Sequence, residues 1–218
     1  MQRTEMTIGT AAGVLLLACT FALIQVNGRK AGSFIGGHGD PDRSLVSVAA
    51  QHQQPGWRET AVHMRLQDDL DRPQDGWCLD VVGSGPHIRF DMPLIAHNIK
   101  PGLFADEAVE FTENGQIRFP AYPGYCVTVM GLNEFALPGA ALMLKKCGED
   151  IPFLNASKFQ TFELLDNGMV QLKGTDLCIT VGDESERTFD PTHRWRTLYM
   201  ERREDCDPAR STWKFVRP

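Results

Sequence analysis

The chain has 218 residues, which is long enough for one well-buried domain and a tail. Its formal net charge is −6 at pH 7. The charged residues among the first 30 are three basic ones and one acidic one, Arg3, Arg29, Lys30 and Glu5, so the rest of the chain has a more negative net charge. Broad binding to nucleic acids or to anionic membranes requires a positive surface, and this composition argues against both.

The first 28 residues form a membrane-directed segment. No charged residue stands between Glu5 and Arg29, and residues 8–26 are mostly Ala, Leu, Val, Ile and Phe. About 20 uncharged residues predict an apolar helix long enough to span a bilayer as a signal-anchor. A cleaved signal peptide, whose apolar core is usually about 7–15 residues long, is an alternative. Lipidation at Cys19 is another, because the sequence "LLAC" is similar to a bacterial lipobox.

Residues 29–60 are rich in Gly, Asp, Gln and Pro and keep neither a helical nor a strand period, which predicts a flexible stem. From residue 61 onward, short apolar runs alternate with turn signals such as Asn114-Gly115 and Asn167-Gly168. Many short strands at this spacing indicate an all-β sandwich or barrel.

An internal repeat runs through this all-β part. The strand-like stretches "GWCLDV" (76–81), "GYCVTV" (124–129) and "DLCITV" (176–181) place cysteines 48 and 52 residues apart. A second pair of stretches, "EAVEFTENGQI" (107–117) and "QTFELLDNGMV" (160–170), matches position by position, and a third copy begins at Ser211. Three copies of one unit of about 50 residues therefore account for residues 61–218.

The order of these elements resembles the ricin-type B-chain lectin family, whose unit carries a C-L-D-V strand, a later cysteine and a Q-x-W strand. The resemblance implies a β-trefoil of twelve strands with pseudo-threefold symmetry over residues 61–218. It places Val109, Phe162 and Trp213 at the buried aromatic position of the unit. It also implies an extracytoplasmic carbohydrate-binding module that is not an enzyme and needs no cofactor. The alternative is a trefoil whose sugar sites have decayed and which now binds other proteins.

The resemblance implies two disulfide bonds within repeats, Cys126–Cys147 and Cys178–Cys206. Cys78 is expected to be a buried free thiol, because Ile99 stands where its partner would be. A zinc site is the alternative interpretation of these four cysteines. The sequence has no Cys-x-x-Cys pair, however, and we predict no metal site. Disulfides form in oxidising compartments, so we expect the body outside the cytosol, anchored by the first segment or secreted or periplasmic after cleavage.

The resemblance places one sugar site in the first repeat, at Asp80, His97 and Asp106. An aspartate would accept hydrogen bonds from sugar hydroxyls, a ring would cover the apolar face of the sugar, and a polar residue would complete the site. The second and third repeats carry no carboxylate after the strand cysteine; the corresponding residues are Thr128, Lys145, Phe159, Thr180, Glu201 and Arg210. Alternatively, Asp80 caps a turn and His97 is a surface residue.

The remaining candidates are weaker. The acidic run over residues 68–75 is similar to part of a calcium loop but lacks the closing glutamate. Asn155-Ala156-Ser157 is a glycosylation sequon. The predicted partners are therefore a glycan and, through the N-terminal segment, a membrane, but no nucleic acid.

Overall fold

The computed structural model describes residues 56–132, 135–149 and 155–218. The predicted membrane segment, Cys19 and all of the predicted stem up to residue 55 lie outside this range. Residues 56–60, which the sequence places in the stem, contain a short 3₁₀ helix, η1 (Trp57–Glu59), whose Trp57 is buried in the core. The folded part therefore begins before residue 61. Within the described residues, no helix has the length and apolar character to span a bilayer.

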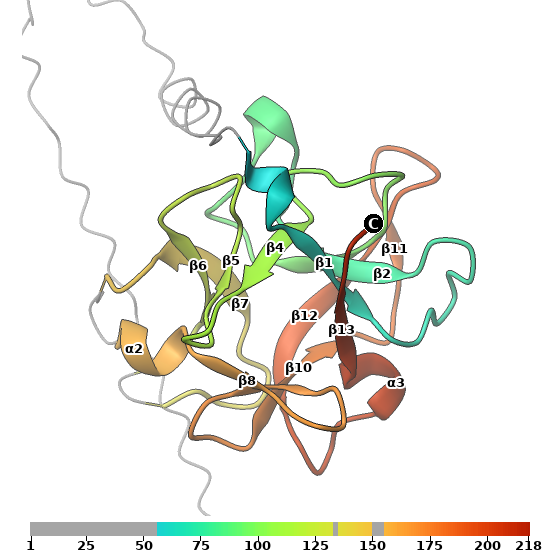
Figure 1. Ribbon diagram of the computed structural model, residues 1–218. Helices are drawn as coiled ribbons and strands as arrows, with labels where there is room; N and C mark the ends of the chain where they lie inside the picture. The colour runs from blue at the N-terminus through green and yellow to red at the C-terminus, as the bar shows by residue number, and fades with distance from the viewer. Residues whose placement is uncertain (1–55, 133–134, 150–154) are drawn as a thin grey trace, which may run out of the picture. The chain divides into compact units, whose positions relative to one another are not determined.

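Each repeat contributes four strands (Figure 1). The first strands are β1 (Val62–Leu66), β5 (Ile117–Arg118) and β9 (Val170–Leu172). The second strands, which carry the cysteines, are β2 (Trp77–Asp80), β6 (Tyr125–Val129) and β10 (Leu177–Val181). The third strands are β3 (Ile95–Asn98), β7 (Leu142–Lys146) and β12 (Arg194–Arg202). The fourth strands are β4 (Ala108–Phe111), β8 (Phe162–Leu164) and β13 (Trp213–Val216).

Four short elements stand outside this pattern. They are η2 (Gly85–His87), α2 (Ala156–Phe159), α3 (Pro208–Ser211) and β11 (Glu186–Arg187). β11 belongs to an insertion in the third repeat and pairs with the beginning of β12.

The second and third strands of each repeat form antiparallel hairpins in the same register. Cys78 pairs with His97, Cys126 with Lys145, and Cys178 with Glu201; every pair joins the cysteine to the position predicted for the sugar-stacking ring. The three repeats are thus equivalent in structure as well as in sequence.

The first and fourth strands close a ring. β1 pairs with β4 and with β13, β4 pairs with β5, and β8 pairs with β9. The two remaining joints are the hydrogen bonds from the Phe162 N–H to the Gly115 carbonyl and from the Trp213 N–H to the Gly168 carbonyl, both 2.7 Å. A six-strand ring with three equivalent hairpins is a β-trefoil, so the predicted fold class is confirmed for the described residues.

The core lies inside this ring. Val109, Phe162 and Trp213, predicted as equivalent buried residues, are all buried. Trp213 also donates from its indole nitrogen to the carbonyl of Ile179 at 3.0 Å, which satisfies its one polar group.

The cysteines differ between repeats. Cys126 and Cys147 form a disulfide with Cα atoms 5.1 Å apart. Cys78 is a buried free thiol, as predicted. Cys178 and Cys206, in contrast, are two free thiols, so the predicted second bond is absent from the structure.

The second and third repeats differ after the third strand. Cys147 stands two residues beyond Lys145, the residue that pairs with Cys126. The equivalent position in the third repeat, two residues beyond Glu201, is held by Arg203. Cys206 follows a further turn, and its sulfur lies 3.4 Å from the Thr180 hydroxyl.

Candidate functional site

The three predicted sugar-site residues lie together in the first repeat. Asp80 ends β2, and Asp106 lies just before β4. His97 lies on β3 opposite Cys78, with its Nδ1 3.8 Å from Asp80 Oδ2. All three are buried, with exposed fractions of 2%, 5% and 4%. Neither alternative from the sequence describes them, because Asp80 lies within a strand and His97 is not at the surface.

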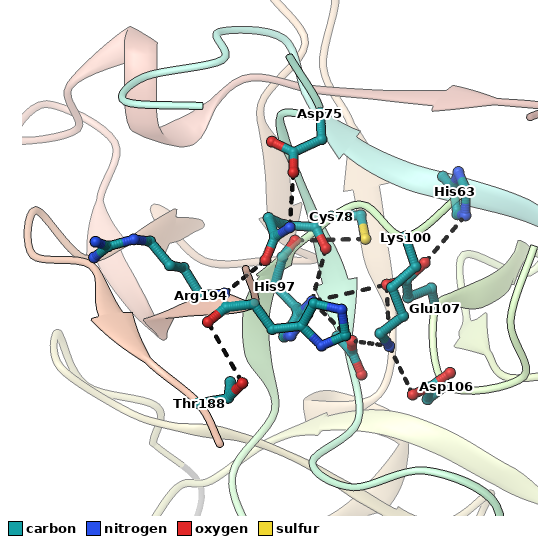
Figure 2. A network of polar contacts seen from close by, with 12 residues as sticks. His63, Asp75, Cys78, His97, Lys100, Asp106, Glu107, Thr188 and Arg194 are labelled. Carbon is teal, nitrogen blue, oxygen red and sulfur yellow. Dashed lines mark hydrogen bonds and ion pairs between the residues drawn. The ribbon is translucent and has the colours of Figure 1, made fainter. Parts of the chain in front are cut away.

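A lysine that the sequence did not single out joins these residues. The Lys100 ammonium lies 3.0 Å from Asp80 Oδ2, 2.8 Å from Asp106 Oδ2 and 3.1 Å from Glu107 Oε1. Figure 2 shows the lysine reaching between the carboxylates from the chain that follows β3. We call Asp80, His97, Lys100, Asp106 and Glu107 the polar cluster.

The polar cluster contains more negative than positive charge. Glu107 is fully buried, and its second oxygen lies 3.5 Å from His63 Nε2 of β1. Asp80 Oδ1 and both Glu107 oxygens make no hydrogen bond within the described part of the chain. A single ammonium thus lies among three carboxyl groups at the junction of β1, β2, β3 and β4.

Burial and this charge imbalance shift the pKa values. Burial raises the pKa of Asp80 well above its usual range and that of Asp106 as well, and Lys100 offsets this only in part. Burial, followed by repulsion from Lys100, lowers the pKa of His97 to about 4. Burial opposes charge on Lys100 too, but the carboxylates outweigh it and raise the lysine pKa above its ordinary value.

His97 cannot act as the stacking ring expected from the sequence while the insertion of the third repeat covers it. The His193 ring packs against the His97 ring at 5.2 Å between centroids, edge to face. Beside it, the Arg194 N–H donates to Asn98 Oδ1 at 2.6 Å, and His97 Nδ1 donates to the Asn98 carbonyl at 2.7 Å. The sequence showed this insertion only as a longer spacing between Cys178 and Cys206 and did not predict its contact with His97.

Another ring borders the polar cluster and is open to solvent. Phe104 is 45% exposed, and its ring centroid lies 5.8 Å from the Lys100 ammonium. The Lys100 side chain itself is 13% exposed. An ammonium, a carboxylate and an exposed ring therefore meet at one edge of the polar cluster.

The second and third repeats carry neutral side chains at the positions equivalent to Asp80 and Glu107. In the second repeat Thr128 replaces Asp80, and its hydroxyl accepts a hydrogen bond from Gln160 Nε2 at 2.9 Å. In the third repeat Thr180 lies 3.0 Å from the hydroxyl of Ser211. Gln160 and Ser211 stand where the first repeat has Glu107. In the second and third repeats, a neutral side chain at the Asp80 position therefore contacts a neutral side chain at the Glu107 position. In the first repeat both positions hold a buried carboxyl group.

The cluster also has the composition of a cation site. Asp80, His97 and Glu107 offer ligand atoms that lie within 4.8 Å of one another. The Lys100 ammonium contacts both carboxylates, so a cationic group of the chain already holds this position.

Comparisons with known proteins give likenesses in structure. No protein-family model matches the sequence, and no curated protein matches it. An agglutinin from Abrus precatorius is 20% identical with a TM-score of 0.48, over 76% of this chain and 49% of its own. The Vibrio vulnificus hemolysin/cytolysin β-trefoil lectin, solved with N-acetyl-D-lactosamine bound, is 13% identical with a TM-score of 0.43, over 72% and 94%.

A third similar structure is a non-toxic homologue of type II RIPs from Momordica charantia in complex with α-methyl-D-galactoside. It is 18% identical with a TM-score of 0.47, over 72% of this chain and 48% of its own. This chain spans about half the length of the two plant chains. The fold of this chain rests on its own strand pairing, described above.

Proposed function

We propose that the trefoil is a carbohydrate-binding module with one sugar site at the exposed edge of the polar cluster. The observation that carries the proposal is the contrast between repeats. Burying charged groups is costly, and the second and third repeats make the same link with neutral side chains. The first repeat keeps three carboxylates and an ammonium instead, and perturbed buried charges of this kind gather at functional sites.

In the proposed site Lys100 and Asp106 contact the sugar hydroxyls. The ammonium donates hydrogen bonds and the carboxylate accepts them; the Lys100 side chain is 13% exposed, and the 5% exposed Asp106 lies 2.8 Å behind it. Phe104 replaces His97 as the ring that covers the C–H face of the sugar, because His97 is covered by His193. Asp80 and Glu107 hold Lys100 in place from the buried side.

The alternative is a trefoil that binds another protein. It is favoured by the connection between β6 and β7, where Leu132, Phe135 and Leu137 are exposed apolar side chains. The two functions differ in which side chains they require, so substitutions at Phe104 separate them.

We further propose that the module works outside the cytosol, held at a membrane by residues 1–28 or released after their cleavage. The Cys126–Cys147 disulfide supports an oxidising compartment. Fractionation of the host cell with an antibody to the trefoil tests this location, and a cytosolic pool of the mature protein contradicts it.

The test of sugar binding compares the full chain with Phe104→Ala on a glycan array that includes galactose, N-acetyl-D-lactosamine and sialylated glycans. Loss of a stacking ring is expected to weaken binding by about three- to tenfold in isothermal titration. Phe189→Ala is the matched control, because Phe189 is also an exposed ring but lies on the insertion of the third repeat.

Binding that falls in Phe104→Ala and not in Phe189→Ala supports the proposal. No glycan signal from the folded wild-type chain contradicts it and leaves the protein-binding alternative. Equal binding by both variants and the wild type places the ligand away from this edge and also contradicts the proposed site.

A further inference from the structure

A groove of about 500 Å³ lies away from the polar cluster, beside the barrel strands. One wall is the turn between β4 and β5, with Phe111, Glu113 and Asn114, and the other is β8 with Glu163 and Lys173, the residue after β9. Figure 1 shows the β4–β5 turn reaching toward β8. Its volume is within the range of small-ligand sites, about 300–1,000 Å³.

The two walls are held in register by close backbone contact at Gly115. The Phe162 N–H donates to the Gly115 carbonyl at 2.7 Å, and a Cβ on Gly115 would come within 2.4 Å of the Phe162 carbonyl oxygen. Gly115 also has a φ of 78°, which only glycine adopts readily. The distance between the two walls at this point is therefore set by the backbone.

The threefold symmetry supplies a comparison. The equivalent turn at Gly168 lies against Trp213, and there the side chain of Gln67 fills the space and donates to the Trp213 carbonyl at 3.1 Å. Lys173 occupies the position equivalent to Gln67, since Gln67 N–H donates to the Thr212 carbonyl and Lys173 N–H donates to the Thr161 carbonyl, both at 2.9 Å. At Gly115 the three atoms nearest an added Cβ belong to Phe162 and Thr161 rather than to Lys173.

The polar side chains around the groove are not used by the fold. Within residues 56–132, 135–149 and 155–218, the side chains of Glu113, Asn114, Glu163 and Lys173 make no hydrogen bond or ion pair. Phe111 adds a half-buried ring that stacks on Phe215 at 5.1 Å. The groove thus presents two carboxylates, an amide, an ammonium and an aromatic wall.

We infer that this groove is a second ligand site, separate from the polar cluster, and that it binds a neutral saccharide. The carboxylates accept hydrogen bonds from sugar hydroxyls, Lys173 and Asn114 donate to sugar oxygens, and Phe111 covers C–H surface. A polyanion would meet Glu113 and Glu163, so a neutral polyhydroxylated ligand is the better fit. The choice of ligand class rests on the proposed function, whereas the site rests on the groove itself.

Two sites on one chain have a functional consequence. A branched or repeating glycan that reaches both would bind more tightly than either site alone, because the second contact becomes intramolecular. A surface that displays many glycans would be favoured over a free monosaccharide for the same reason.

The test is a two-dimensional ¹H–¹⁵N NMR titration of the full chain with galactose, glucose, mannose and N-acetylglucosamine. Saturable shifts are expected at the amides of Asn114, Gly115 and Glu163. Lys173→Gln introduces the side chain found at the equivalent position 67, so it should preserve the fold, fill the groove and weaken these shifts by about tenfold or more in apparent affinity. Lys214→Gln, an exposed lysine on β13, is the control and should change nothing.

The outcomes separate the two sites. Groove shifts that disappear in Lys173→Gln and persist in Phe104→Ala support the second site. Shifts confined to residues 100–106 and lost only in Phe104→Ala overturn the second site and retain the proposed function. The absence of saturable shifts at the groove amides with all four sugars overturns the inference, whatever the glycan array reports for the polar cluster.

Discussion

The polar cluster depends on one side chain for its charge balance. Lys100 is the cation that contacts Asp80, Asp106 and Glu107 together. Removing one partner from a buried ion pair typically costs about 3–5 kcal/mol, because the remaining charges stay buried without compensation. The cluster is therefore held together by the same lysine that we propose contacts the ligand, and stability and binding are linked at this residue.

His97 should make the stability of the domain depend on pH. Its pKa is about 4 in the folded state and about 6.5 in an unfolded chain, so folding favours the neutral ring. The stabilisation is fully present above pH 6.5 and is lost as the pH falls toward 4. Between pH 8 and pH 5 this one residue costs about 2 kcal/mol of unfolding free energy. The raised pKa values of Asp80 and Asp106 act in the opposite direction, because their protonated forms are favoured in the folded state.

Comparing His97→Gln with the wild type isolates the histidine. Urea unfolding at pH 8 and pH 5 should show that the variant loses about 2 kcal/mol less than the wild type over this interval. His87→Gln, at an exposed histidine, is the control and should follow the wild type. Parallel pH profiles for His97→Gln and the wild type would show that the ring titrates normally in the folded protein.

The sequence predicted some residues of the polar cluster and missed others. Asp80, His97 and Asp106 were predicted from the family resemblance, which assigns them to positions of the repeated unit, and the structure brings the three together. Lys100 lies after the strand, where the three repeats share no pattern, so nothing in the sequence marked it. His193 belongs to an insertion, whose contact with another repeat depends on tertiary structure. Sugar binding by the predicted residues stays a prediction.

At the scale of the strands, hairpin register decides which cysteines can bond. The disulfide joins Cys126 to the residue two positions beyond its strand partner. The bond that the family resemblance implies for this repeat is confirmed, with the two cysteines 21 residues apart in the sequence. In the third repeat Arg203 holds the equivalent position, and Cys206, three residues further along, is a free thiol whose side chain lies beside that of Cys178.

The disulfide is expected to contribute about 3 kcal/mol, the usual effect for a loop of this size. The double variant Cys126→Ala, Cys147→Ala should lose this amount in urea unfolding, and dithiothreitol should destabilise the wild type but not the variant. Cys206→Ala serves as the control and should behave as the wild type does toward the reductant, because Cys206 is a free thiol.

Alkylation of the unfolded chain without reductant provides a second measurement. Among the cysteines of the described residues, mass spectrometry should find the label on Cys78, Cys178 and Cys206 and not on the bonded pair. A protected Cys178–Cys206 pair would restore the bond that the family resemblance implies and would contradict the arrangement described here.

At the scale of the molecule, the trefoil is closed by its two ends. β13 lies at the end of the chain and pairs with β1, the first strand, over four residue pairs from His63 and Val216 to Leu66 and Trp213 (Figure 1). β1 also pairs with β4 and β2, so it links the first and third repeats. The sequence predicted a third copy of the repeated stretch at Ser211, but not its pairing with β1, which depends on tertiary structure.

Removing residues 213–218 should therefore do more than shorten the chain. It deletes the buried Trp213, leaves β1 with an unpaired edge, and removes the hydrogen bond to the Gly168 carbonyl that closes the ring between β13 and the β8–β9 turn. Loss of a buried tryptophan alone costs about 3–5 kcal/mol, a large share of the roughly 5–15 kcal/mol that stabilises a typical domain.

Removal of Arg217 and Pro218 alone spares all of β13 and is the matched control. Hydrogen exchange should show protection lost across β1, β4 and β9 in the longer truncation and retained in the shorter one. If β6 and β7 lost protection as early as β1, the three repeats would unfold as one cooperative unit; loss confined to β1 would instead show that ring closure is not what holds the repeats together.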